Sequence, residues 1–422
     1  MSWLPASRRR FAQGLGLLGA AALAMPARAT VPARTIVVGG GFAGATCARE
    51  LRRGGATVTL VERQTDYIAC PMSNAVVAGL RAIEEQRFAY HALQEEGVAV
   101  VHAAAVAVEA ERRVVVLEDG SRLDYDRLLL APGIDVRFDA LAGYDEAASE
   151  SLPHAWKAGA QTVLLRRQLE AMPDGGTVVM TVPANPYRCP PGPYERASLI
   201  AHYLKTTKPR SKLLILDAKD RFSKQSLFGA AWAELYPGLL EWVPLSAGGN
   251  VVEVDAPARR LITEFGDHRA DVANVIPPQR AGAIAVGAGV ADRSGWCPID
   301  PVTFESRLVP GIHVIGDAAL AGAMPKSAFA ANAQAKACAA AMLALLRGDA
   351  PREPRLINTC YSLVAPGYGI SIAGVYRPVD GVLAEIEGAG GISPKDVPRE
   401  FRAAEAAYGD AWFKTVTTEV FG

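Results

Sequence analysis

Residues 35–44 read TIVVGGGFAG, an apolar strand that runs into a glycine-rich turn. A helix is predicted over residues 43–53 and a second strand over residues 57–61, which ends at Glu62. A strand, turn, helix and strand with an acid about 20 residues beyond the loop are typical of a dinucleotide-binding unit, whose glycines admit a pyrophosphate to the helix N-terminus. The residues predicted to bind the dinucleotide here are Gly39, Gly41, Gly44, Glu62 and the adjacent Arg63.

The sequence before this unit resembles an export leader. Residues 7–11, SRRRF, fit a twin-arginine pattern, residues 15–24 are apolar, and residues 27–29, ARA, fit a cleavage site. The apolar stretch is too short to span a bilayer. We expect residues 1–29 to be a twin-arginine signal peptide, and the mature protein to work in the periplasm. Because nicotinamide coenzymes are not maintained there, the expected dinucleotide is a tightly bound FAD.

Composition excludes several kinds of partner. The chain has 422 residues, enough for two or three domains, and its 44 Lys and Arg balance its 44 Asp and Glu. This balance gives no reason to expect nucleic acid or an acidic lipid surface. After the leader we find no apolar run of about 18 residues, so no transmembrane segment is expected, and residues 337–346 are interpreted as a buried helix. No Cys-x-x-Cys-His motif occurs, so we expect no c-type haem on this chain.

Three later segments are expected to approach the same cofactor. Strands predicted over residues 98–106 and 113–117 suggest a β-meander, and an apolar strand at 128–130 ends in a small-Pro-Gly turn. A strand beginning at residue 312 ends in Gly-Asp before a helix predicted over 328–346, and its acid could bind a ribityl hydroxyl. A nearby lysine could stabilise a reduced flavin or be a solvated surface residue. The predicted cofactor-binding residues in these segments are Val106, Pro132, Gly133, Gly316, Asp317 and Lys326.

Residues 177–217 repeat the first unit with a different loop. A strand is predicted over 177–182, a helix over 195–205, and a strand over 212–216 that ends at Asp217. The connecting loop reads PANPYRCPPGP instead of being rich in glycine. Proline offers no N–H group to a phosphate. We therefore expect this unit to have lost its nicotinamide site, with Cys189 where the pyrophosphate would lie.

With these motifs in view, the chain resembles the flavoprotein subunit of flavocytochrome c sulfide dehydrogenase, a relative of glutathione reductase and sulfide:quinone oxidoreductase. The resemblance runs from residue 35 to residue 422, and its most specific parts are YIACPMSN at 67–74, the Cys189 loop, and NTCYS at 358–362. It implies an α/β fold with two dinucleotide-binding (Rossmann-like) domains of the glutathione-reductase type and a C-terminal α+β interface domain. The predicted bounds are 30–150 and 291–348 for the FAD-binding domain, 151–290 for the second Rossmann-like domain, and 349–422 for the interface domain.

The resemblance also implies roles for particular residues. Cys70 matches a cysteine that forms a thioether to the flavin 8α-methyl group, although a buried or disulfide-bonded cysteine is the alternative. Cys189 and Cys360 match a redox-active disulfide that oxidises sulfide, and a structural disulfide is the alternative. Glu195 matches a proton-transfer group, but an acid that complements a helix dipole would look the same. Cys297 has no place in this scheme, and its pairing with Cys70 or Cys360 would contradict it.

The expected electron acceptor is a c-type cytochrome, either a partner subunit or a soluble protein, which carries the haem. Trp412 is either a lining residue on that path or a packing residue. Cys47 and Cys338 are interpreted as small core residues of apolar helices. A sulfide:quinone oxidoreductase is the alternative, but residues 399–421 look too charged and broken for a long apolar face. A nicotinamide-dependent disulfide reductase and a non-catalytic flavin-binding partner stay open as further alternatives.

Overall fold

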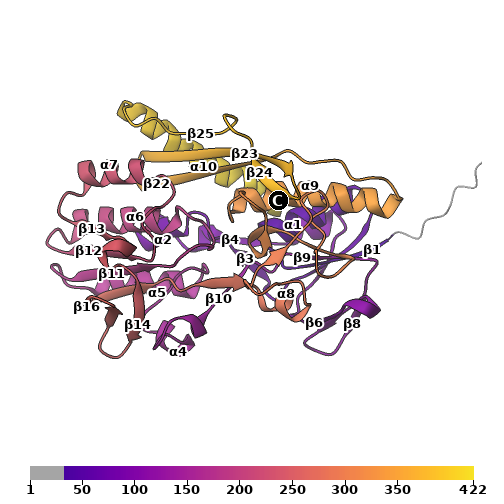
Figure 1. Cartoon of the computed structure of the whole chain (residues 1–422), viewed down its shortest axis with the longest axis horizontal. Coiled ribbons are helices and arrows are strands. Elements are labelled where there is room, and N and C mark those ends of the chain that lie inside the picture. Colours follow the sequence, from indigo (N-terminus) through magenta and orange to yellow (C-terminus); the bar gives the residue numbers. More distant parts are fainter. Residues whose placement is uncertain (1–32) are drawn as a thin grey trace, which may run out of the picture. The chain divides into compact units, whose positions relative to one another are not determined.

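The computed structural model describes residues 33–422, so the signal peptide predicted over residues 1–29 lies outside the described residues. A five-stranded parallel sheet with the order β20-β9-β1-β2-β5 contains the first dinucleotide-binding unit (Figure 1). Its strands are β1 (Arg34–Val38), β2 (Thr57–Val61), β5 (Ala99–Val101), β9 (Arg127–Leu130) and β20 (Ile312–Val314). The apolar runs of the sequence are long and unbroken because both faces of such a sheet are covered.

Two long helices pack against each other beside this sheet. Helix α1 (Phe42–Arg53) follows the glycine-rich turn, and α9 (Ala328–Arg347) crosses it with a face of small residues. Cys47 and Cys338 lie in this contact and are fully buried, which confirms their interpretation as core residues. Among the described residues, α9 is the one helix with the length and apolarity to cross a membrane, and 44% of its most apolar window is buried against the rest of the chain.

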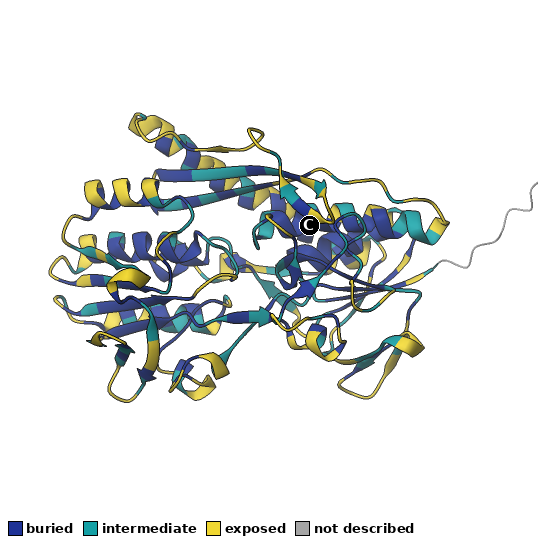
Figure 2. Ribbon diagram, viewed as in Figure 1, coloured by how far each residue is buried: buried dark blue, intermediate teal, exposed yellow. Residues whose placement is uncertain are grey.

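The second unit forms a separate four-stranded parallel sheet, as the repeat predicted. Its order is β13-β12-β11-β17, and the predicted strand at 177–182 is confirmed as β11. The buried residues follow the strands of both parallel sheets, and the exposed residues gather in loops and on outer helix faces (Figure 2). The elements are β11 (Thr177–Val182), β12 (Lys212–Asp217), β13 (Leu240–Val243), β17 (Val272–Val275), α5 (Ala160–Ala171), α6 (Gly192–Thr207) and α7 (Gln225–Leu235).

The strand predicted over residues 98–106 is wrong. The chain divides there into β5, which extends the first parallel sheet, and β6 (Ala105–Glu109), which begins the three-stranded meander with β7 (Val114–Leu117) and β8 (Arg122–Asp124). Between them the Ala104 N–H group donates to the carboxylate of Glu118 at 3.0 Å. Strands of both sheets have the same side-chain period along the chain. The sequence therefore did not show where the chain leaves the parallel sheet and enters the meander.

The last part of the chain is an antiparallel sheet crossed by a long helix. Residues 399–421, which the sequence suggested were broken, form one continuous helix of 23 residues, α10 (Arg399–Phe421). Its charged residues Arg402 and Glu405 pair with each other inside the protein at 3.1 Å, and its apolar residues from Phe413 onwards are buried or half-buried. The strands are β22 (Leu356–Ala365), β23 (Tyr368–Val379), β24 (Val382–Glu385) and β25 (Gly391–Ile392).

Shorter elements connect these sheets and helices. They are β3 (Asp66–Ile68), α2 (Ser73–Val77), β4 (Arg87–Ala89), α3 (His91–Glu95), β10 (Ile134–Val136), α4 (Glu146–Ser149), β14 (Val251–Asp255), β15 (Arg260–Thr263), β16 (Gly266–Arg269), β18 (Gln279–Ala281), α8 (Ala283–Gly287), β19 (Cys297–Pro298) and β21 (Ala319–Leu320).

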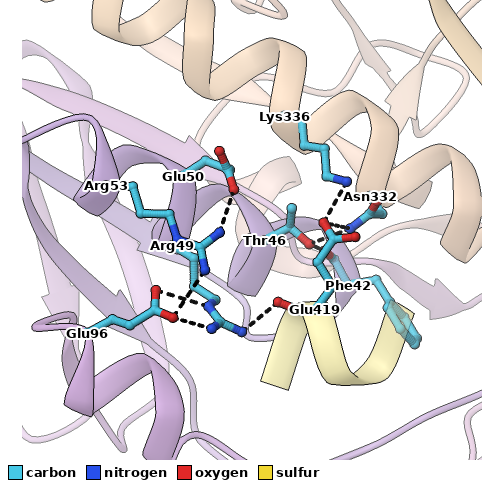
Figure 3. A network of polar contacts seen from close by, with 9 residues as sticks. All are labelled: Phe42, Thr46, Arg49, Glu50, Arg53, Glu96, Asn332, Lys336 and Glu419. Carbon is cyan, nitrogen blue, oxygen red and sulfur yellow. Dashed lines mark hydrogen bonds and ion pairs between the residues drawn. The ribbon is translucent and has the colours of Figure 1, made fainter. Parts of the chain in front are cut away.

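A polar network fastens the end of α10 to α1 and α9 (Figure 3). The buried guanidinium of Arg49 donates to the carbonyl oxygen of Glu419 at 2.5 Å and pairs with Glu96. The Glu419 carboxylate pairs with Lys336 at 2.5 Å and accepts from Asn332 at 3.4 Å. Because buried charges are costly unless paired, these bonds define where α10 ends against the helix that follows the glycine-rich loop.

Phe421, at the end of α10, lies in an aromatic cluster at the start of α1. Its ring stacks on Tyr67 and Phe88, with centroid distances of 5.2 and 5.3 Å, and meets Phe42 edge-on.

Phe421→Ala should lower the free energy of unfolding by about 3–5 kcal/mol, because it leaves a cavity among large rings. Tyr408 on the same helix is 62% exposed, and Tyr408→Ala is the control, with an effect within about 0.5 kcal/mol. Denaturant titration measures both, and equal losses would contradict the packing role of Phe421.

Candidate active site

A cavity of about 540 Å³ lies where the two dinucleotide-binding units and β22 meet. Its volume is in the range of cofactor pockets. Residues from all three regions line it, including Trp412 of α10. The sequence-predicted site residues that line this cavity are Gly39, Gly41, Glu62, Arg63, Cys70, Pro132, Gly133, Cys189, Glu195, Gly316, Asp317 and Cys360.

The glycine-rich loop is packed too closely for any side chain at two positions. Gly39 has φ +101°, and a Cβ atom there would collide with the carbonyl oxygen of Ala131 in the turn after β9. A Cβ atom on Gly44 would collide with the Gly39 carbonyl oxygen, so Gly44 shapes the loop without lining the cavity. The Glu62 carboxylate accepts from the Gly40 N–H group at 2.8 Å, which holds the acid beside the loop. This arrangement fits a dinucleotide on the N-terminus of α1.

Asp317 places an unpartnered acceptor in the cavity wall. Gly316 before it has φ +72°, and burial raises the pKa of the Asp317 carboxyl although Arg188 opposes that shift. One carboxylate oxygen lies 3.8 Å from Arg188, and Oδ1 has no hydrogen-bond partner among the described residues. Buried acceptors are rarely left unsatisfied. The free oxygen therefore fits a hydroxyl-bearing ligand such as the ribityl chain of FAD.

Lys326 and Val106 do not reach the cavity. The Lys326 ammonium donates to the carbonyl oxygens of Asp317 and Ala319 at 2.8 and 2.7 Å, and it lies 3.9 Å from the ring centroid of Trp296. This position behind the wall contradicts both the flavin contact and the solvated lysine. Val106 is 56% exposed because the chain turns before it, and residues 103–105 line the cavity instead.

Arg188, which the sequence reasoning missed, is one of several cations that line the cavity. Its guanidinium lies near Asp317 and donates to the carbonyl oxygen of Trp156. Burial opposes its charge, yet nearby Cys70 and Asp317 together raise its pKa. The loop that contains Arg188 was already prominent in the sequence, so its position beside Cys189 was an available signal.

Cys189 and Cys360 meet at the cavity from different parts of the chain. Cys189 has a left-handed φ of 57°, its N–H group donates to the Lys326 carbonyl at 2.7 Å, and its own carbonyl accepts from Gly192 at 2.8 Å. Burial raises the pKa of the Cys189 thiol, and the proximity of Cys360 raises it further. Cys360 lies in β22, where the side-chain N–H of Asn358 is 3.3 Å from its sulfur.

All six cysteines of the chain are free thiols in this structure. The link between Cys189 and Cys360 therefore stays a prediction, for which the structure supplies the neighbouring positions. Cys297 is buried in β19 and linked to neither Cys70 nor Cys360. The Cys70 thiol faces the carbonyl oxygen of Trp156 at 3.9 Å, on the same cavity wall as Arg188.

Glu195 is a half-buried group in the cavity wall rather than a solvated helix acid. It lies in the first turn of α6, where its carboxylate accepts from Asn74 at 2.7 Å and from the Leu363 N–H group at 2.8 Å. Burial raises its pKa, while these two hydrogen bonds work against the shift. Asn74 is oriented in turn by the buried Arg196, whose Nε donates to it at 2.9 Å. Neither Asn74 nor Arg196 was singled out from the sequence, although Asn74 ends the YIACPMSN motif.

In the second unit, the acid at the position that would bind a nucleotide ribose is already bonded within the protein. Asp217, at the end of β12, accepts hydrogen bonds from Tyr194 at 2.6 Å and from Trp242 at 2.9 Å. Its other oxygen pairs with Lys219 at 2.6 Å. The Tyr194 ring stacks on Phe222 at 3.6 Å. These contacts occupy the acid that would otherwise accept from a nucleotide ribose.

Residues 162–277 match the family described as "Sulfide dehydrogenase [flavocytochrome c] flavoprotein chain, central", and residues 352–421 match "Flavocytochrome c sulphide dehydrogenase, flavin-binding". The chain is also 53% identical over 45 residues to the sulfide dehydrogenase [flavocytochrome c] flavoprotein chain of Chlorobaculum thiosulfatiphilum, which covers 94% of that sequence and 10% of this chain. This chain belongs to that flavoprotein family. Residues 33–161 of the flavoprotein match "Pyridine nucleotide-disulphide oxidoreductase".

The flavoprotein has more distant relatives among sulfide:quinone oxidoreductases. The mitochondrial enzyme of Dictyostelium discoideum is 20% identical over 306 residues, 67% of this chain and 65% of that one. The mitochondrial enzyme of Schizosaccharomyces pombe is 21% identical over 220 residues, so the match spans 46% of its length and 48% of this chain.

Solved structures confirm the predicted fold class of the flavoprotein. The sulfide:quinone oxidoreductase of Aquifex aeolicus superposes with a TM-score of 0.72 at 16% identity, covering 92% of each chain. The structure of a putidaredoxin reductase–putidaredoxin complex gives a TM-score of 0.66 at 19% identity, covering 90% of this chain and 93% of that one. The individual domain bounds stay predictions.

Proposed function

We propose that this flavoprotein oxidises sulfide at a disulfide between Cys189 and Cys360 beside FAD, and passes the electrons singly to a c-type cytochrome. The observation that carries this proposal is that both thiols and Glu195 line the same cavity as the glycine-rich loop. Family membership supports sulfide as the substrate. The acceptor is a cytochrome subunit or a soluble cytochrome, and the haem belongs to it.

In the proposed reaction, hydrosulfide bonds to one sulfur of the disulfide and the other cysteine leaves as a thiolate. Glu195, held by Asn74 and the backbone of Leu363, is placed to take up the proton of the bound sulfur. The Arg188 guanidinium in the wall compensates negative charge that accumulates in the closed cavity. FAD, when bound, accepts an electron pair and releases electrons one at a time, which joins a two-electron donor to a one-electron acceptor.

We also propose that Cys70 holds FAD by a thioether and that residues 1–29 direct twin-arginine export to the periplasm. Cys70 lies in the cavity wall, which supports the first part. A flavin with a dissociation constant of about 1 nM, roughly 12 kcal/mol, would still be lost slowly into a dilute compartment. A covalent bond prevents that loss.

Anaerobic titration with sulfide tests the function. One equivalent of sulfide should bleach the flavin absorbance, and added cytochrome c should restore it. NADH and NADPH should leave the absorbance unchanged, because Asp217 is already bonded within the protein. No bleaching by sulfide would contradict the proposal and favour a non-catalytic flavin-binding protein.

The second candidate is delivery of the electrons to a membrane quinone. The likeness in fold to the Aquifex aeolicus sulfide:quinone oxidoreductase favours it. The continuous helix α10 also offers the length that such a role needs, but Phe413, Val416, Val420 and Phe421 are buried in the core. Faster reoxidation of the sulfide-reduced protein by a soluble quinone than by cytochrome c would favour this candidate.

The raised pKa of Glu195 gives the reaction a testable pH dependence. The ionised carboxylate is the form that accepts a proton, so the rate should fall as the pH drops through a pKa above the ordinary 4.5 of glutamate. Glu195→Gln should lower the rate of sulfide oxidation about a hundredfold, and the fall in rate at low pH should disappear. Ionisation of sulfide itself affects the rates of wild type and variant equally. The difference between their pH–rate profiles therefore reports the ionisation of Glu195 alone. Parallel profiles would contradict its role.

A further inference from the structure

A buried lysine lies directly beneath Cys360. Lys224, the residue before α7, has a left-handed φ of 60° and only 4% exposure, and its side chain extends from the second unit into the C-terminal sheet. The ammonium donates to the Cys360 carbonyl at 2.8 Å, to the Ser362 hydroxyl at 2.7 Å, and to the Ile370 carbonyl at 3.4 Å. All three of its protons therefore point at neutral oxygens.

A buried ammonium held by neutral groups is expensive for a protein to keep. Lys219, in the same domain, shows the usual solution, since its ammonium pairs with Asp217 at 2.6 Å. Burial lowers the pKa of Lys224 to about 8, and the nearby Cys360 opposes that shift more than any other group. The other titratable groups near the Lys224 ammonium are Glu195 of α6, Cys189 before that helix, and Glu405 of α10.

The surroundings of the Cys360 sulfur also favour a negative charge. The Asn358 amide is 3.3 Å from that sulfur, and its own oxygen accepts from the Ser327 hydroxyl at 2.5 Å, which fixes the amide with its N–H toward the cysteine. Cys360 thus has an N–H donor at its sulfur and a cation at its carbonyl. Hydrogen bonds and cations both stabilise a thiolate relative to a thiol.

We propose that Lys224 is the counter-charge of the cysteine pair, and that it stabilises the thiolate left on Cys360 when hydrosulfide opens the disulfide at Cys189. This inference rests on the proposed function. In the step, a bond forms between the hydrosulfide sulfur and Cys189, the bond between the two cysteines breaks, and its electron pair stays on Cys360. In this step the hydrogen stays on the new persulfide, and Glu195 accepts it afterwards. The one negative charge that entered with hydrosulfide ends beside the Lys224 ammonium, which acts as a positioning residue through the field it applies.

The test measures the ionisation of Cys360 without using sulfide. The dithiothreitol-reduced holoprotein is treated anaerobically with iodoacetamide at a series of pH values, and alkylation of the peptide that contains Cys360 is followed by mass spectrometry. Lys224→Met should slow this alkylation near pH 7 about tenfold, because the reacting thiolate loses its counter-charge. If Lys224→Met does not fold, Lys224→Gln, which keeps a donor for Ser362, takes its place.

Ser362→Ala is the matched control, because it removes one hydrogen bond of the ammonium and keeps the charge. It should alkylate at the wild-type rate. Identical profiles for wild type and the Lys224 variant would overturn the inference, and so would an equal shift in Ser362→Ala, which would assign the effect to packing. If sulfide does not bleach the flavin of the wild type, the proposed function is wrong. The alkylation experiment would still measure the effect of Lys224 on Cys360, because it uses no sulfide.

Discussion

Replacing Cys189 with serine should abolish the reduction of the bound flavin by sulfide. The rate is expected to fall by at least about a thousandfold, as when a reacting group is deleted from other enzymes. A serine oxygen keeps the size of the side chain and the left-handed turn that the structure shows at this position, but it forms no disulfide for hydrosulfide to attack. Stopped-flow absorbance under anaerobic conditions measures the loss.

Cys297→Ala is the matched control for this experiment. Cys297 is fully buried, whereas Cys189 is half-buried, and Cys297 does not line the cavity. The control should reduce at the wild-type rate. If Cys189→Ser is still bleached by sulfide at a rate near that of the wild type, the pair of cysteines is not the site of oxidation.

Replacing Cys70 with serine should convert the flavin from a covalently held group to a dissociable one. Wild-type protein unfolded in acid is expected to keep its yellow colour in the precipitate, and Cys70→Ser to release all of it into solution. The change is all-or-none, because the other contacts of the cavity are lost on unfolding whereas a thioether survives. Intact-mass analysis measures the same difference as the presence or absence of one flavin mass.

Cys189→Ser serves here as the control that should retain the flavin after unfolding. A wild type that releases its flavin would end the covalent assignment and leave the sulfide reaction untouched. Flavin retained by Cys70→Ser would place the attachment on another residue. The two serine variants therefore separate holding the cofactor from reacting with the substrate.

The local parts of the fold could be predicted from sequence. The strands at 57–61 and 177–182 have the bounds that their apolar runs indicated, because strands buried on both faces consist of continuous apolar residues. The glycine-rich loop could also be predicted, since the collision of a Cβ atom at Gly44 with the Gly39 carbonyl oxygen follows from local geometry. Such features depend on neighbours within a few tens of residues.

The parts that depend on distant packing could not be predicted. Whether Lys326 points into the cavity or behind it depends on Trp296, which lies under its side chain. The continuity of α10 depends on the burial of Arg402 with Glu405, which makes a charged segment part of the core. Lys224 gave no signal at all, because its role depends on contacts with β22 and β23, more than a hundred residues away.

The contact between Phe421 and Tyr67 has a consequence for the order of events during biosynthesis. The glycine-rich loop is translated early, yet the Phe421 ring that stacks on Tyr67 is translated hundreds of residues later. A nascent chain therefore lacks one wall of its flavin cradle until α10 has emerged. Cofactor loading is consequently expected after translation, and any secretion of this protein in a loaded form would have to wait for it.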